Sequence, residues 1–204
     1  MSLDLSANWN TTDGAWTTTG YTDGLRTSRH AMAAVPSAFS AGLGTNINGH
    51  LLLVGSSVDL NSSFLWNGYN LDTNVWSPVT PTPLPTLKNV FNFTSLQRHA
   101  IVTDPDTGLV YVIGGFQTQN ATKVYTYNRL IVMDPSTKTL IKSDLATAAT
   151  GLASMAAAWS TVRKTVMVFG GTQAPPSPGI GGLNNMTEYN PSTDQWTPLV
   201  RNRT

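Results

Sequence analysis

A repeated pattern of short apolar runs and glycine-stopped turns limits what this chain can fold into. Its cleanest copy begins with the β-favouring run 165–169, which ends at Gly170 and Gly171. A second short run at 185–189, a polar turn and a third run containing Trp196 follow. Such runs, separated by turn residues, predict an antiparallel meander of strands. One meander cannot bury both of its own faces, so copies of it must pack against one another.

Two earlier segments repeat the same order of runs and turns. Between the second and third copies the spacing is constant at 56 residues, whereas between the first and second it varies, as insertions in loops would produce. The corresponding positions are Gly115 and Gly171, Asp134 and Asn190, and Leu140 and Trp196 at 56; Arg29 and Arg98 at 69; Gly55 and Gly114 at 59; and Trp76 and Leu140 at 64. The chain therefore contains three units of about 60 residues in register.

Charged residues are scarce, and this favours strands over helices. Only 11% of the residues are charged, and Glu188 is the single glutamate. Surface helices usually carry Glu and Lys, whereas Thr, Ser, Asn and Gly fill the polar positions of this chain. The segment 145–158 is rich in alanine but shows no 3.6-residue stripe, so we predict a loop followed by a strand there.

The units set the expected domain organisation, a single incomplete domain of repeated sheets. Its parts are 1–28, a partial unit with only its outer strands; 29–96, the first unit and a linker; 97–152, the second unit; and 153–204, the third. The linker holds prolines at 78, 81, 83 and 85, and cannot supply a central strand because proline lacks the amide donor that a ladder needs.

The third unit resembles the kelch repeat of the galactose oxidase and kelch superfamily, in which a strand ends in two glycines before strands with Tyr and Trp. The second unit keeps the glycines but has Met133 and Leu140 at the ring positions, and the first has Ser56 after its glycine. The resemblance implies an all-β, kelch-type β-propeller with about three four-stranded antiparallel blades plus a partial N-terminal blade. The residues that carry the resemblance are Gly55, Tyr69, Trp76, Gly114, Gly115, Gly170, Gly171, Tyr189 and Trp196.

We expect these residues to hold the blades together. Glycines permit a sharp turn and a close backbone approach, and the rings supply apolar area between blades. A propeller closes with about four to eight blades, so three and a part leave the ring open. We expect one of three explanations for the open ring. The chain is a fragment of a longer protein, or strands after Thr204 complete the partial unit, or two chains close one ring together.

The resemblance also raises copper-radical oxidase chemistry, which in that family needs a tyrosine crosslinked to a cysteine. The chain has no cysteine, so that cofactor cannot form within these residues. His30 and His99 occupy equivalent places in two repeats, which favours a structural role over convergence on one metal. His50 opens a strand and is expected to be half-exposed.

Other catalytic arrangements are not supported by the sequence. Asp104 and Asp106 flank Pro105 in a turn sequence, where aspartate hydrogen-bonds the backbone. The glycines within 179–182 follow three prolines, and no helix is predicted after them, so this is not a phosphate-binding loop. We therefore predict no enzyme activity, no catalytic residue, no cofactor and no metal ligand.

The leading hypothesis is a non-catalytic scaffold that binds a protein or glycan. In a four-stranded meander, the loops between the second and third strands emerge on the same face as the connections between units. The candidate contacts on that face are Phe116, Gln117, Gln119 and Gln173. The alternatives are part of a galactose oxidase-like copper oxidase whose catalytic residues lie outside this chain, and a structural cell-surface or secreted spacer.

Charge and hydropathy restrict the partners and the compartment. A net charge of +1 without a Lys/Arg cluster argues against nucleic acid, and no apolar run approaches the roughly 18 residues needed to span a bilayer. The first residues do not resemble a signal peptide. Six glycosylation sequons favour an extracellular glycoprotein slightly, since about three or four would arise by chance. They begin at Asn10, Asn61, Asn92, Asn120, Asn185 and Asn202.

Overall fold

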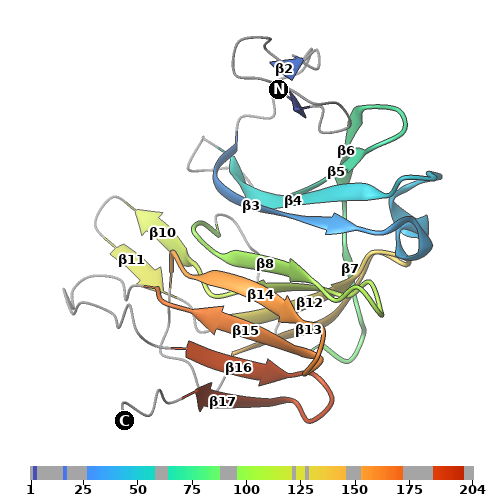
Figure 1. The fold of residues 1–204 in the computed structure, drawn as a ribbon. Helices are drawn as coiled ribbons and strands as arrows, with labels where there is room; N and C mark the ends of the chain where they lie inside the picture. Colours follow the sequence, from blue (N-terminus) through green and yellow to red (C-terminus); the bar gives the residue numbers. More distant parts are fainter. Residues whose placement is uncertain are drawn as a thin grey trace.

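A computed structural model shows an all-β protein built from several antiparallel sheets. The described residues are 2–3, 16–17, 27–57, 64–87, 96–120, 123–126, 129–145, 153–171 and 186–199. The expected all-β class is thereby confirmed, and the arrangement of the sheets is β-propeller-like (Figure 1). The number of blades stays a prediction.

Each of three sheets contains four antiparallel strands, arranged side by side in the order in which they occur in the chain. Sheet 1 consists of β3 (Thr27–Val35), β4 (His50–Ser57), β5 (Phe64–Asn70) and β6 (Val75–Val79). Sheet 2 contains β8 (Ala100–Thr103), β9 (Val110–Ile113), β12 (Arg129–Asp134) and β13 (Thr139–Leu145). Sheet 3 consists of β14 (Ala156–Ser160), β15 (Thr165–Phe169), β16 (Met186–Asn190) and β17 (Gln195–Leu199).

Sheet 2 carries a fifth strand from the proline-rich linker. The strand β7 (Thr82–Pro83) lies parallel to β13 at the outer edge of the sheet. The amides of Thr82 and Leu84 donate to the carbonyls of Lys138 and Leu140 at 2.8 and 3.1 Å. Pro83 lies between these two donors, so the strand pairs without needing a donor from proline. The linker thus supplies an edge strand, in agreement with its exclusion from a sheet centre.

Two small antiparallel pairs complete the strands. Near the N-terminus, β1 (Ser2–Leu3) pairs with β2 (Trp16–Thr17). After Gly115, β10 (Phe116–Asn120) pairs with β11 (Lys123–Thr126). The sequence analysis assigned Phe116, Gln117 and Gln119 to a loop between strands, and the structure corrects this because they lie on β10.

Successive side chains along the strands of sheet 2 point to opposite sides, and both faces of this sheet are buried. Val110 and Val112 on β9 pack toward sheet 1, whereas Tyr111 and Ile113 pack toward sheet 3. All four residues of β9 are buried, as a strand between two other layers requires. Sheet 2 therefore lies between the other two sheets (Figure 1).

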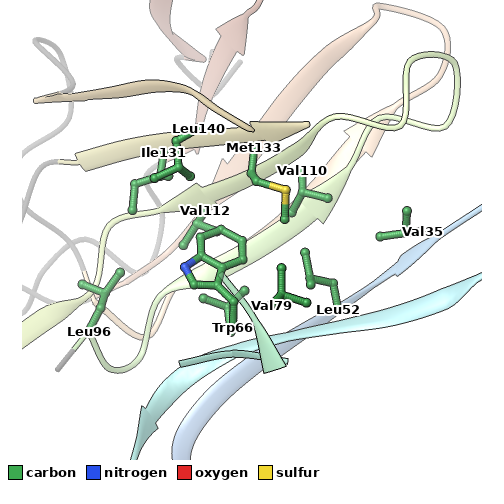
Figure 2. Packing of buried hydrophobic residues seen from close by; sticks show 11 residues of the cluster. Val35, Leu52, Trp66, Val79, Leu96, Val110, Val112, Ile131, Met133 and Leu140 are labelled. Carbon is green, nitrogen blue, oxygen red and sulfur yellow. The ribbon is translucent and has the colours of Figure 1, made fainter. Parts of the chain in front are cut away.

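The interface between sheets 1 and 2 is built around an apolar cluster. Figure 2 shows Trp66 at its centre, with Leu96 on one side and Leu52 and Val79 on the other. Burying a side chain of this size contributes about 2–3 kcal/mol. The buried members are Val35, Leu52, Val54, Trp66 and Val79 of sheet 1, Val110, Val112, Ile131, Met133 and Leu140 of sheet 2, and Leu96.

The interface between sheets 2 and 3 contains more aromatic rings. Tyr111 is stacked on Trp159 at 5.9 Å and lies 6.2 Å from Tyr189, measured between ring centroids. Tyr189 is paired across the strands with Trp196, and their centroids are 5.1 Å apart. These separations are typical of favourable tilted and offset pairs.

The innermost strands fix the order of the sheets. In the described part of the chain, β8 packs beside β3 on one side and beside β14 on the other. All three begin at the same end of the molecule, which we call the loop end, and finish at the opposite turn end (Figure 1). Sheets that radiate from adjacent innermost strands are the arrangement of a propeller.

The turn end consists of repeated five-residue turns. In three of them the fifth amide donates to the first carbonyl, as from Gly108 to Asp104 at 2.8 Å. The Asp104 side chain also accepts the Asp106 amide at 2.9 Å, which confirms the backbone role predicted for it. The turns span 70–74, 104–108, 134–138, 160–164 and 190–194.

The connection 36–49 ties sheet 1 to these turns of sheet 2. It holds two 3-10 helices, η1 (Ser37–Phe39) and η2 (Ala41–Leu43). Phe39 lies so close to Gly108 that a Cβ on that glycine would be 2.1 Å from the Phe39 Cβ. Gly42 approaches the Pro135 carbonyl oxygen in the same way, at 2.6 Å for a built Cβ. Contact at the turn end therefore reinforces the apolar interface.

Candidate ligand-binding face

The glycine pairs lie at the loop end, where β9 and β15 finish. Gly114 and Gly115 have φ of 62° and 97°, and Gly170 and Gly171 have φ of 68° and 101°. Residues with a Cβ rarely adopt these angles, so the backbone conformation explains the choice of glycine at both places. All four residues are buried, as is Gly55 at the corresponding place in sheet 1.

The pair in sheet 2 brings two other segments together. The Gly114 amide donates to the Arg129 carbonyl at the start of β12, at 2.8 Å. A Cβ on Gly115 would lie 2.9 Å from the Gln97 carbonyl oxygen and 3.1 Å from the His99 Cβ. The glycines thus place the connection before β8 next to the start of β12.

Two arginines flank this glycine pair. Arg98 is exposed and has a φ of 52°, unusual for a residue with a Cβ. Arg129 is buried, with 4% of its surface exposed. Arg98 lies in the connection before β8, and Arg129 begins β12.

The conformation of Arg98 is tied to the packing of neighbouring sheets. Ser154, at the corresponding position of sheet 3, has a φ of 59°. Its amide donates to the Arg98 carbonyl at 2.8 Å. The repeated left-handed residue therefore links successive sheets, and at sheet 2 it also presents a positive charge.

The described histidines make contacts within the fold. His99 is buried, and its Nε2–H donates to the Val54 carbonyl of sheet 1 at 3.0 Å. His50 lies at the turn end, 3.0 Å from the Asn46 side chain, and burial lowers its pKa although Asp72 partly opposes this. The expectation that His50 is half-exposed was wrong, because only 2% of its surface is exposed. The side chain of His30 lies outside the described structure.

Carboxylates gather at the opposite end of the sheets. Their oxygens accept bonds from turn amides and from lysines, as Asp194 does from Lys142 and Asp106 from Lys164. Asp72 accepts the amides of Ile47 and Asn48, and these bonds lower its pKa. The acidic residues of the described turns are Asp72, Asp104, Asp106, Asp134 and Asp194. By register Asp144 is nearer the loop end, on the outer strand β13.

The predicted ligand residues follow the glycines of sheets 2 and 3. Phe116, Gln117 and Gln119 are on β10, where Phe116 pairs with Thr126 and Gln117 with Tyr125. This hairpin projects from the loop end beside the glycine pair (Figure 1). Gln173 lies outside the described residues. The sequence analysis did not single out Arg98 and Arg129 as candidate contacts, although an Arg-His sequence is repeated within β3 and immediately before β8.

The Tyr and Trp positions of the repeat are in the sheets, away from the loop end. Tyr69 pairs with Trp76 in sheet 1 as Tyr189 does with Trp196 in sheet 3. Each tyrosine hydroxyl also donates at 2.9 Å to the last residue of the following turn, Asn74 or Asp194. The same geometry in two sheets favours a structural role for these rings.

Among the described residues, no group of three or more His, Cys, Asp or Glu side chains is arranged to hold a metal ion. No helix in that part of the chain has the length and apolar character needed to cross a membrane.

Comparisons with known proteins match the chain only at the level of structure. No protein-family model and no curated protein sequence matches it. A solved structure titled "Structure of YjhT" is similar with a TM-score of 0.57 and 13% sequence identity, over 88% of this chain and 52% of that one. The chain thus spans about half of that neighbour. At this identity the likeness shows the fold alone, and 107 matching chains of solved structures show that the fold recurs.

Proposed function

We propose that this chain belongs to a kelch-type β-propeller that acts as a non-catalytic scaffold and binds an acidic protein or glycan at its loop end. The carrying observation is the hairpin of β10 and β11, which projects from the loop end directly after Gly114 and Gly115. Arg98 is exposed at the same end, in the connection that approaches Gly115. Rigid sheets that present loops and a charged residue at one end suit binding better than they suit storage or spacing.

The distribution of carboxylates supports a non-catalytic function. Acid–base catalysis needs a carboxyl group aimed at a substrate, whereas Asp104 accepts the Asp106 amide and the Thr107 hydroxyl. Glu188 binds Arg163 and Thr165 through both of its oxygens. These carboxylates are engaged in contacts within the fold, and neither is hydrogen-bonded to Arg98 or Arg129 in the described contacts.

A binding assay with matched charge variants tests the proposal. We expect the immobilised chain to retain uronic-acid oligosaccharides or Asp/Glu-rich peptides over neutral counterparts, by surface plasmon resonance at 150 mM salt. Arg98→Gln should weaken this binding about tenfold, the loss of one charge-assisted hydrogen bond. Lys138→Gln removes the same charge from an exposed residue at the turn end and should change little. Equal effects of the two variants, or no preference for acidic probes, would overturn the proposal.

A further inference from the structure

The far face of sheet 3 is the face that points away from sheet 2. It is an apolar surface that extends across all four strands of the sheet. By register Ala156, Phe169, Met186 and Leu199 form one row across the sheet. The next row contains Ala158, Met167, Glu188 and Thr197. Phe169 is 54% exposed although it belongs to β15, a central strand of the sheet, where it lies in the row nearest the loop end. An exposed row of this kind marks an interaction surface.

The same positions are used for packing in sheet 2. At the repeat spacing of 56, Met167, Phe169 and Met186 correspond to Tyr111, Ile113 and Leu130. Those three residues of sheet 2 are buried against sheet 3. The far face of sheet 3 therefore has the position and the apolar character of a surface that receives another sheet.

The far face of sheet 1, which points away from sheet 2, resembles the surface with which sheet 3 packs on sheet 2. Its strands place Ala34, Leu51, Tyr69 and Trp76 in one row, with Met32 beside them. The Tyr69–Trp76 pair corresponds to the Tyr189–Trp196 pair with which sheet 3 packs on sheet 2. Met32 is 49% exposed on this face. Sheet 1 thus presents the kind of surface that packs on the far face of a preceding sheet.

The ion pair between Arg163 and Glu188 on the sheet 3 face is compatible with burial. Arg163 Nε and Nη2 donate to the two Glu188 oxygens at 2.5 and 2.6 Å, and the Thr165 hydroxyl donates at 2.6 Å. A bidentate pair with a third hydrogen bond leaves no uncompensated carboxylate when a partner covers it.

We infer that this face binds a second copy of the chain head to tail, with the far face of sheet 3 of each copy packed on the far face of sheet 1 of the other. The contact continues the sheet-to-sheet packing already present twice within the molecule. The chain matches about half of a solved β-propeller-like chain, so two copies supply the length of one ring. A two-fold ring uses each surface twice and leaves neither exposed.

Sedimentation velocity of the 204-residue chain tests this inference. We expect a dimer, converted to a monomer by Phe169→Asp and also by Met32→Asp, with circular dichroism checking that both variants fold. Val162→Asp is the matched control, since Val162 is 91% exposed in the turn 160–164 and lies off the face. An equimolar mixture of the Phe169→Asp and Met32→Asp chains should recover a dimer, because it rebuilds one intact contact.

Each other outcome overturns the inference. A wild-type monomer at tens of micromolar shows that the face does not bind a second copy. A dimer broken by Phe169→Asp but not by Met32→Asp shows a symmetric contact between two copies of sheet 3 instead. Dissociation by Val162→Asp as well shows a general effect of added charge.

Discussion

Individual glycines in this chain have different tolerances to substitution, although they share a backbone conformation that disfavours residues with a Cβ. Gly170 has open space around a built Cβ, whereas Gly115 would bring its Cβ within 2.9 Å of a backbone oxygen. Both have positive φ, at 68° and 97°. Substitution of Gly170 by alanine therefore costs only the unfavourable backbone conformation. Substitution of Gly115 also creates a clash with backbone atoms that cannot rotate away.

We expect Gly170→Ala to lower the free energy of unfolding by about 1 kcal/mol and Gly115→Ala by about 3 kcal/mol. Urea unfolding followed by tryptophan fluorescence measures both. Equal losses would show that the close approach to Gln97 is relaxed at little cost, and that conformation alone selects glycine at these places.

At the scale of elements, one carboxylate fastens the turn 160–164 to β16. Glu188 accepts two bonds from Arg163 of that turn and one from Thr165 at the start of β15. The Arg163 bond, followed by the Thr165 bond, lowers the pKa of Glu188 from 4.5 to about 2. A depressed folded-state pKa stabilises the protein above pH 4.5, and this stabilisation is lost as the pH falls through about 2.

We expect Glu188→Gln to lower the free energy of unfolding at pH 7 by about 1–2 kcal/mol, a modest value because the Arg163 guanidinium is largely exposed. The difference from the wild type should shrink between pH 4.5 and 2. Thermal melting across this range checks it, with Arg163→Gln as the companion variant. If the difference in the free energy of unfolding between the two proteins stays constant with pH, the Glu188→Gln variant is destabilised by altered packing and not by the lost charge.

At the scale of the whole molecule, Tyr111 connects two sheets through an ionisable ring. It is 2% exposed and lies between Trp159 and Tyr189 of sheet 3. Burial, with a smaller effect from the Asp104 charge, raises the pKa of Tyr111 to about 12. A raised folded-state pKa contributes stability below pH 10 that is lost as the pH rises toward 12.

We expect the wild type to lose stability between pH 10 and 12 and Tyr111→Phe to lose distinctly less. The measurement is urea unfolding at several alkaline pH values. Tyr69→Phe is the matched control, because its ring lies on the far face of sheet 1, outside the contact between sheets 2 and 3. If both variants follow the wild type, the contact between these sheets does not respond to ionisation of Tyr111.

Much of the fold was predictable because its units repeat. The spacing of 56 residues places Val110 and Val166, Met133 and Tyr189, and Leu140 and Trp196 in the same roles. The turn role of Asp104 followed from its Asp-Pro sequence, which favours a turn in any context. Local chemistry was sufficient in these cases.

The remaining features depend on tertiary contacts. The strand β10 has no apolar alternation in Phe116–Asn120 to mark it, and β7 forms only because β13 offers it carbonyl partners. The proximity of Arg129 to the glycine pair was not predicted for the same reason, because it depends on the bond from the Gly114 amide to the Arg129 carbonyl, a contact that no spacing in the sequence predicts. The ligand contacts proposed on β10 stay predictions.

The outer edges of the three sheets restrict how the molecule can aggregate. Sheet 1 ends with β6, which contains Pro78, and sheet 3 ends with β17, which contains Pro198 at the matching register. Proline interrupts the row of donors that a foreign strand would need. In sheet 2, β13 has no proline, and β7 covers part of it instead. Growth of the sheets by strand addition at their rims, the route to amyloid-like fibres, is therefore obstructed on all three.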